Sequence, residues 1–128
     1  MLYRLKNISK VSIVGETLSR LKLLEAFAIQ FEGCDKITDD DIRQIEFPHN
    51  ILHETLKTLM LNFKGCREIS NEGVKDFSVG IASLKNLQNL ALRLNRCPKI
   101  TDDGLKQLAF TMSQNFHNLK GVSLSFST

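Results

Sequence analysis

Three cysteines are the residues of this chain whose spacing first raises the question of chemistry. Cys34, Cys66 and Cys97 are separated by 32 and 31 positions in a chain of 128 residues. Even spacing in a repeat predicts a column of thiols, whereas a zinc site needs a tetrahedron of ligands, usually drawn from CxxC or similar pairs that this sequence lacks. Buried cysteine commonly acts as a small apolar residue. We therefore expect three reduced, inert thiols and no metal or redox site.

Acidic and histidine side chains offer no better chemistry. The acidic run 39–41 follows Thr38 directly before an apolar segment, which is typical of a helix start and lacks the spacing of a calcium-binding loop. No motif places a serine or cysteine nucleophile beside the three histidines: His49, His53 and His117. The glycines form no phosphate-binding cluster. The sequence therefore predicts no enzyme, no cofactor and no small-molecule substrate.

The equal spacing of the cysteines belongs to an internal repeat of 31–32 residues. A leucine lies ten positions before each cysteine, and a fourth leucine opens a further copy: Leu24, Leu56, Leu87 and Leu119. From each leucine, apolar residues follow at offsets three, five and seven, as in Leu59, Leu61 and Phe63. Alternation with a period of two predicts a strand with one face in the core. We expect these strands to lie side by side in one parallel sheet.

Each strand is followed by signals for a turn and a helix. An aliphatic residue and then Ser or Thr with acidic neighbours precede an apolar pattern of helical spacing. In the second and third copies the pattern comprises Val74, Phe77, Ile81 and Leu84, then Leu105, Leu108, Met112 and Phe116. In the first copy we expect a capping box between Thr38 and Asp41 and a short helix at 39–45 that Pro48 ends, followed by an irregular connection. Units of this kind bury their apolar faces only by stacking.

The first 23 residues fit the repeat in part. Shifted by one repeat, the helix positions fall on apolar residues: Val11, Val14, Leu18 and Leu21. Residues 1–23 are therefore predicted to be the back half of a repeat whose strand is missing. Full repeats and then the strand of a further one are expected at 24–55, 56–86, 87–118 and 119–128. Because neither end shows a capping unit, we expect a single array over 1–128 that is a segment of a longer one; the alternative is a complete small protein with degenerate caps.

The pattern L-x-x-L-x-L-x-[FL]-x-x-C-x-x-I-[ST]-[DN]-x-G occurs at 56–73 and 87–104 and recurs in altered form at 24–41. It resembles leucine-rich repeats of the cysteine-containing type, and the resemblance covers almost the whole chain. It implies an α/β solenoid with a parallel sheet on the concave face and helices on the convex face. The usual cysteine-containing form is similar to what substrate-recognition subunits of ubiquitin ligases carry. Here the segment between strand and cysteine is two residues longer, and no F-box is visible.

The sheet face turned away from the helices is the candidate binding surface, because the concave face of leucine-rich repeats commonly binds partners. Offsets two, four, six and eight of each strand supply its side chains. Met60 is its largest apolar group, and Lys64 and Arg93 are its main positive charges. We select as partner-binding candidates Gln30, Glu32, Met60, Asn62, Lys64, Asn89, Arg93, Asn95, Ser123 and Ser125.

Taken together, these patterns predict a non-catalytic scaffold that docks a protein partner on its concave face. The alternative is a structural subunit, fixed inside a larger assembly through its helices or loops. Two weaker alternatives are the substrate-recognition part of a ubiquitin ligase and nucleic-acid contact through Arg93 and Lys64. A formal charge of +3, spread over the chain, argues against nucleic acid because it forms no basic patch.

Composition and cysteine usage bear on the compartment. Hydrophobic residues make up 42% and charged residues 24%, as in ordinary soluble domains. No apolar stretch approaches the roughly 18 residues needed to cross a bilayer, so we expect no membrane partner. The N-terminus has no apolar run that would indicate a signal peptide. An odd number of widely spaced cysteines fits reduced thiols, which predicts a cytoplasmic, reducing location.

Overall fold

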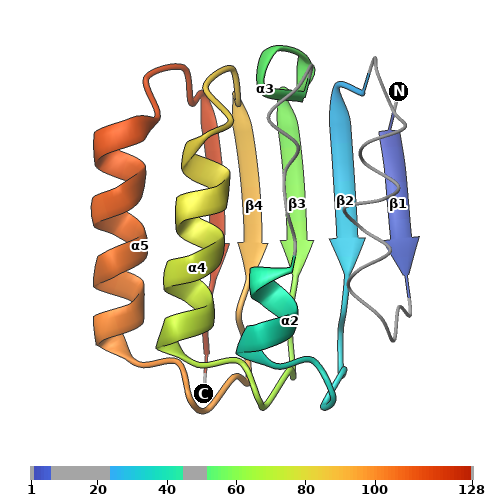
Figure 1. The fold of residues 1–128 in the computed structure, drawn as a ribbon, viewed down its shortest axis with the longest axis vertical. Helices are drawn as coiled ribbons and strands as arrows, with labels where there is room; N and C mark the ends of the chain where they lie inside the picture. The colour runs from blue at the N-terminus through green and yellow to red at the C-terminus, as the bar shows by residue number, and fades with distance from the viewer. Residues whose placement is uncertain (1, 7–23, 45–51, 128) are drawn as a thin grey trace.

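The structure, a computed structural model, describes residues 2–6, 24–44 and 52–127. Within these residues, five strands form one sheet in the order β1-β2-β3-β4-β5, and every neighbouring pair is parallel (Figure 1). The strands are β1 (Leu2–Lys6), β2 (Ala26–Gln30), β3 (Thr58–Asn62), β4 (Asn89–Arg93) and β5 (Gly121–Ser125). The expectation of parallel strands side by side in one sheet is confirmed.

The described helices are α2 (Asp39–Arg43), α3 (Leu52–Thr55), α4 (Asn71–Ala82) and α5 (Asp102–Asn115). Three of them lie on one face of this sheet. In Figure 1, α2, α4 and α5 stand in front of the strands, and α3 lies at the end from which β3 starts. The described part of the chain is therefore an α/β structure with a parallel sheet and helices on one side.

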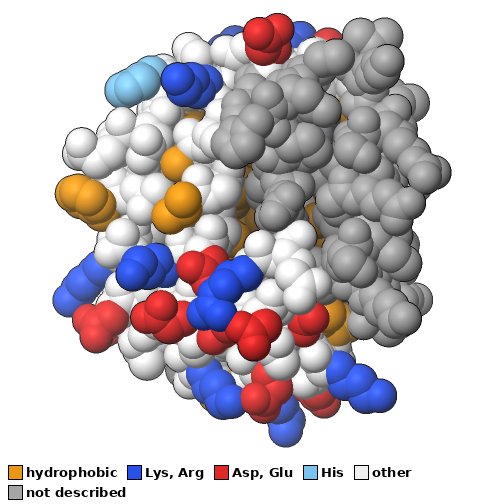
Figure 2. All heavy atoms as spheres, viewed as in Figure 1, with side chains coloured by type: hydrophobic (Ala, Val, Ile, Leu, Met, Phe, Trp, Pro, Cys, Tyr) orange, Lys and Arg blue, Asp and Glu red, His pale blue; other side chains and the backbone are white. Residues whose placement is uncertain are grey.

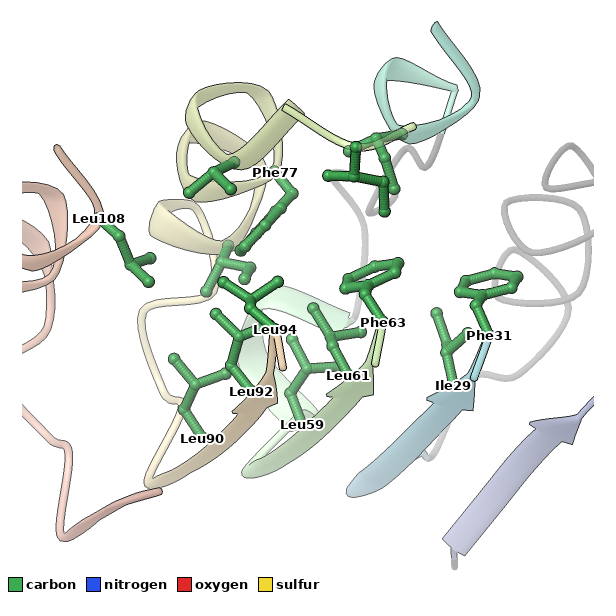
Figure 3. Close-up of a cluster of buried hydrophobic side chains, with 14 of the residues drawn as sticks. Ile29, Phe31, Leu59, Leu61, Phe63, Phe77, Leu90, Leu92, Leu94 and Leu108 are labelled. Atoms are coloured by element: carbon green, nitrogen blue, oxygen red, sulfur yellow. The ribbon is translucent and has the colours of Figure 1, made fainter. Parts of the chain in front are cut away.

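The strand register confirms the alignment of the repeat. Ile29 pairs with Leu61, Leu61 with Leu92, and Leu92 with Leu124. The residues two positions earlier pair in the same way, so the inward-facing side chains form continuous rows across the sheet. In β2, β3 and β4 these side chains are buried, and Figure 3 shows them leaving the sheet toward the helices. Burial of these rows is the main apolar contribution to the fold.

Two phenylalanines just beyond the strands join the sheet to a helix. The rings of Phe31 and Phe63 are stacked, with centroids 5.5 Å apart and planes 12° apart. Phe63 is also stacked on Phe77 of α4, at 6.0 Å and 30°. Phe63 therefore lies between the neighbouring unit and its own helix (Figure 3).

The helix-start predictions are confirmed at two positions. Thr38 and Asp41 form both halves of a capping box before α2, and the hydroxyl of Ser70 accepts a hydrogen bond from the Glu72 N–H at 3.2 Å before α4. In both cases a side chain satisfies an N–H group that the first helical turn leaves without a partner. The acidic run 39–41 therefore belongs to a helix N-terminus. The helix ends at Arg43, two residues before the predicted end, and Pro48 lies outside the described residues.

Two predictions about the chain's organisation were wrong. A strand does precede residues 7–23, because β1 pairs with β2 from Leu2 against Ala26. The spacing between those paired residues is 24 positions, shorter than the 31–32 of the other units, so a shift by one full repeat passes over it. The predicted helix positions at 11–21 lie outside the described residues. The connection before β3 also contains a one-turn helix, α3, where irregular chain was expected.

The cysteines form the predicted column, and each of two thiols bonds to the preceding unit. The Cys66 Sγ donates to the carbonyl of Phe31 at 2.9 Å, and the Cys97 Sγ donates to the carbonyl of Phe63 at 3.1 Å. Cys66 and Cys97 are buried and Cys34 is half-buried. Burial raises the pKa of the Cys66 thiol to about 12, since a buried thiolate would lose its hydration. These contacts give the cysteines a packing role.

We expect Cys66 to resist alkylation in the folded protein. Its folded pKa of about 12 lies above the ordinary value of 9.0, so folding favours the neutral thiol. The stability that the neutral Cys66 thiol contributes to the folded state is complete below pH 9 and is lost as the pH rises from 9 toward 12. Iodoacetamide labelling followed by peptide mass spectrometry tests the resistance to alkylation: Cys66 should react slowly in buffer and rapidly in urea. The half-exposed Cys34 is the internal control, and equal labelling rates for both residues in buffer would contradict the assignment.

A second cross-unit contact involves the first residue of each helix. The Asp39 carboxylate accepts hydrogen bonds from the Ser70 N–H at 2.9 Å and from the Ser70 hydroxyl at 2.5 Å. The Asn71 side chain makes the equivalent pair with Thr101, accepting from its N–H at 2.9 Å and donating to its hydroxyl at 2.8 Å. Each helix start is therefore tied to the capping residue of the next unit.

Candidate partner-binding face

The sheet side opposite the helices carries the predicted partner-binding residues, and we call it the open face. Figure 3 shows the labelled core side chains pointing toward the helices, and no described helix lies over the other side. The register sets the open-face residues in rows. One row contains Gln30, Asn62, Arg93 and Ser125, and the next contains Ala28, Met60, Ala91 and Ser123.

Five of the candidates are exposed, and of these only Glu32 forms an ion pair with a described residue. Met60 is 38% exposed although it is a large apolar side chain. Arg93 is exposed and makes no hydrogen bond or ion pair with any residue that the structure describes. Ser123 is exposed, and Asn89 makes only a long hydrogen bond of 3.4 Å to the Thr58 hydroxyl. Methionine and arginine, here exposed on adjacent strands, are residue types enriched at protein interfaces.

Asn62 is a correction to the predicted set. It is only 9% exposed, and its side-chain oxygen accepts a hydrogen bond from the Lys64 N–H at 3.1 Å. The side chain is therefore turned back onto the end of its own strand, where it satisfies a backbone donor. Ala28 in the adjacent row is buried too, although its position was expected to face solvent. Alternation along a strand predicts which side a residue takes, but not how far its neighbours cover it.

Other candidates bind one another. Lys64 forms an ion pair with Glu32 at 3.2 Å, so this lysine is not the free charge that the sequence indicated. The Asn95 side chain donates to the Ser127 hydroxyl at 3.0 Å and accepts from the Ser125 hydroxyl at 2.8 Å. Gln30 is half-buried. The residues that the structure leaves for a partner are therefore chiefly Met60, Arg93 and their exposed neighbours.

Sequence reasoning missed two positions in these rows because it missed β1. The register places Arg4 beside Ala28 and Lys6 beside Gln30. With Arg93, the two rows that contain Met60 and Gln30 then hold three basic positions and no acidic one. The alternation of Leu2–Lys6 was the signal that could have identified this strand.

Metal-ligating side chains do not gather in the described part of the chain. Among the described residues, no group of three or more His, Cys, Asp or Glu side chains could hold a metal ion. His117 is exposed, and the side chains of His49 and His53 lie outside the described residues. Two hollows of the described surface, of about 740 and 510 Å³, are lined by none of the ten candidates. Both of these hollows therefore lie away from the candidate residues of the open face.

Comparison with known proteins adds no family assignment. No family model matches the chain, and no curated protein matches it either. Within the described residues, none of the helices combines the length and apolar character that crossing a membrane requires.

Proposed function

We propose that this chain is an array of leucine-rich repeats that binds a protein partner on its open face without catalysis. The observation that carries the proposal is the exposed pair of Met60 and Arg93 on adjacent strands of a regular parallel sheet. An apolar anchor and an arginine can supply most of the binding energy of an interface whose surroundings are polar. The motif at 56–73 and 87–104 supports the family part of the proposal.

A second candidate function is a structural subunit held through its helices. Val79 on α4 is 65% exposed and Phe110 on α5 is 62% exposed, and the two occupy the same position in successive units. Figure 2, which views the helix side, shows hydrophobic side chains at the surface over both helices. Apolar side chains in register on neighbouring helices are a feature that a fixed subunit contact would use.

Paired surface variants separate the two functions. One variant carries Met60→Ser and Arg93→Ser, and its matched control carries Val79→Ser and Phe110→Ser. Affinity purification from cells with quantitative mass spectrometry should show a partner that the first variant loses and the second retains. The reverse pattern would replace the scaffold proposal with the structural one. Partners released by nuclease or by a steep dependence on salt would instead indicate nucleic acid.

A further inference from the structure

The β5 end of the sheet lacks the cover that every earlier unit receives. The inward row residues Val122, Leu124 and Phe126 are 48%, 38% and 42% exposed. Their counterparts in β3 and beyond it, Leu59, Leu61 and Phe63, are 0%, 3% and 0% exposed. The two rows occupy equivalent positions in the sheet. The exposed row of the β5 end therefore differs in lacking a segment that covers it.

A hollow lies between Phe126, at the end of this row, and the turn that leads into α5. It has a volume of about 740 Å³, and its apolar lining includes Leu94, Cys97, Ile100, Leu105 and Phe126. At the corresponding place one unit earlier, α5 packs on α4 over the buried row of β4. The hollow is therefore beside the start of α5, where the turn and the first helical residues of a further unit would lie.

Two hydrogen-bond acceptors point to the chemistry of that helix. Phe31 and Phe63 each accept a cysteine thiol from the following unit, and Leu94 is the equivalent residue in the third unit, where no described thiol reaches it. Asp39 and Asn71 each bind the capping residue of the following unit, and Asp102 is the equivalent residue of α5. No described residue donates to the Asp102 side chain. A carboxylate only accepts hydrogen bonds, so its partner must offer an N–H and an O–H, as Ser70 does to Asp39.

A third requirement is steric. A Cβ at Gly73 would lie 2.3 Å from the Asp39 Oδ1, and a Cβ at Gly104 would lie 2.2 Å from the Asn71 Oδ1. Each glycine lies three residues after the capping residue that is bound. A segment that binds Asp102 in the same way therefore needs glycine at this position.

We propose that the β5 end is a docking site for a turn–helix segment of defined chemistry. The segment carries a cysteine that donates to the Leu94 carbonyl, a Ser or Thr helix cap that binds Asp102, and a glycine three residues after that cap. Its helix packs beside α5 over Val122, Leu124 and Phe126. This surface is on the helix side, so the proposal stands independently of the open face.

A second copy of the chain does not supply this segment. The described turn–helix segments that carry the motif already pack within their own array, and residues 1–23 contain no cysteine. The occupant is therefore a turn–helix segment that residues 1–128 do not supply, with a free turn and an apolar helix face. Self-association through this end would contradict the proposal.

A peptide with the sequence of residues 97–118 is a suitable probe, because it carries the cysteine, the threonine cap and the glycine at the required spacing. We expect saturable binding of the labelled, reduced peptide to the full chain, measured by fluorescence anisotropy. Gly104→Val in the peptide should weaken binding at least tenfold. This loss cannot be assigned to a weaker helix, because valine has a higher helix propensity than glycine.

Protein variants complete the test. Asp102→Ala in the full chain should weaken peptide binding at least fivefold, whereas Arg93→Ser on the open face should leave it unchanged. The same sequence appended directly after Thr128 raises its effective concentration, so it should increase Tm, and the appended Gly104→Val version should not. Three results would overturn the proposal: binding that is indifferent to the glycine and to Asp102, no effect of the segment in either form, or a dimer by sedimentation that competes with the peptide.

Discussion

Replacing Phe63 with alanine is expected to lower the free energy of unfolding by about 3–5 kcal/mol, the range typical of deleting a buried phenylalanine. The ring has no exposed surface and contacts Phe31 and Phe77 in stacked geometry, so its removal leaves a cavity between two units and a helix. Such stacked pairs add roughly 0.5–1.5 kcal/mol beyond the area they bury. A domain of this size is commonly stable by only about 5–15 kcal/mol, so the variant should lose a large part of its stability.

Urea unfolding followed by circular dichroism measures this change. Phe110→Ala is the matched control, because the Phe110 side chain is 62% exposed and its truncation should change stability by no more than about 0.5 kcal/mol. Phe63→Leu should fall between the two, since leucine keeps part of the packed volume. A loss below about 1 kcal/mol for Phe63→Ala would show that the core can close around the missing ring, contrary to the stacked arrangement.

The repeat in the sequence was sufficient to predict most of the sheet. Alternating apolar residues at constant offsets predicted β2 to β5 and their register, because identical units stack with equivalent residues side by side. The same alignment failed at β1, whose spacing to β2 is shorter than that of the other units. A repeat of constant length predicts only those elements that keep that length.

The candidate binding face was predicted less well than the fold. The side on which Met60 and Arg93 lie follows from alternation, but the ion pair of Lys64 with Glu32 and the burial of Asn62 depend on the final side-chain geometry. The cross-unit roles of Asp39 and Asn71 were hidden for a different reason. Both residues have the types expected at a helix start, and only the distance between neighbouring units reveals their second role.

The change in stability caused by Gly104→Ala is expected to have opposite signs in two backgrounds, the wild type and the Asn71→Ala variant. In the wild type, the new Cβ would lie 2.2 Å from the Asn71 Oδ1 and 2.9 Å from its Cγ, so Asn71 must move and its hydrogen bonds to Thr101 are strained or lost. Overpacking of this kind costs about 1–3 kcal/mol. We therefore expect Gly104→Ala alone to destabilise the protein by about 2 kcal/mol.

With Asn71→Ala already present, the same substitution should stabilise the protein. The nearest remaining atom is the Asn71 Cα at 3.4 Å, which is close to ordinary contact, and Gly104 is not among the described glycines with positive φ. Alanine is then favoured over glycine in the helix by about 1 kcal/mol. The two effects of opposite sign give a coupling of about 3 kcal/mol between positions 71 and 104, at the upper end of what contacting residues show.

Urea unfolding of the wild type, the two single variants and the double variant measures this coupling. Gly33→Ala serves as a control. Gly33 has a φ of 73° and open space around its missing Cβ, so alanine there should cost about 1 kcal/mol whether or not Asn71 is present. Additive effects at 71 and 104 would contradict the steric account. In the first unit Asp41 occupies the position equivalent to Gly104, and its carboxylate completes the capping box with Thr38. The steric account therefore predicts glycine at this helix position wherever a side chain of the preceding unit enters it, as at Gly73 and Gly104.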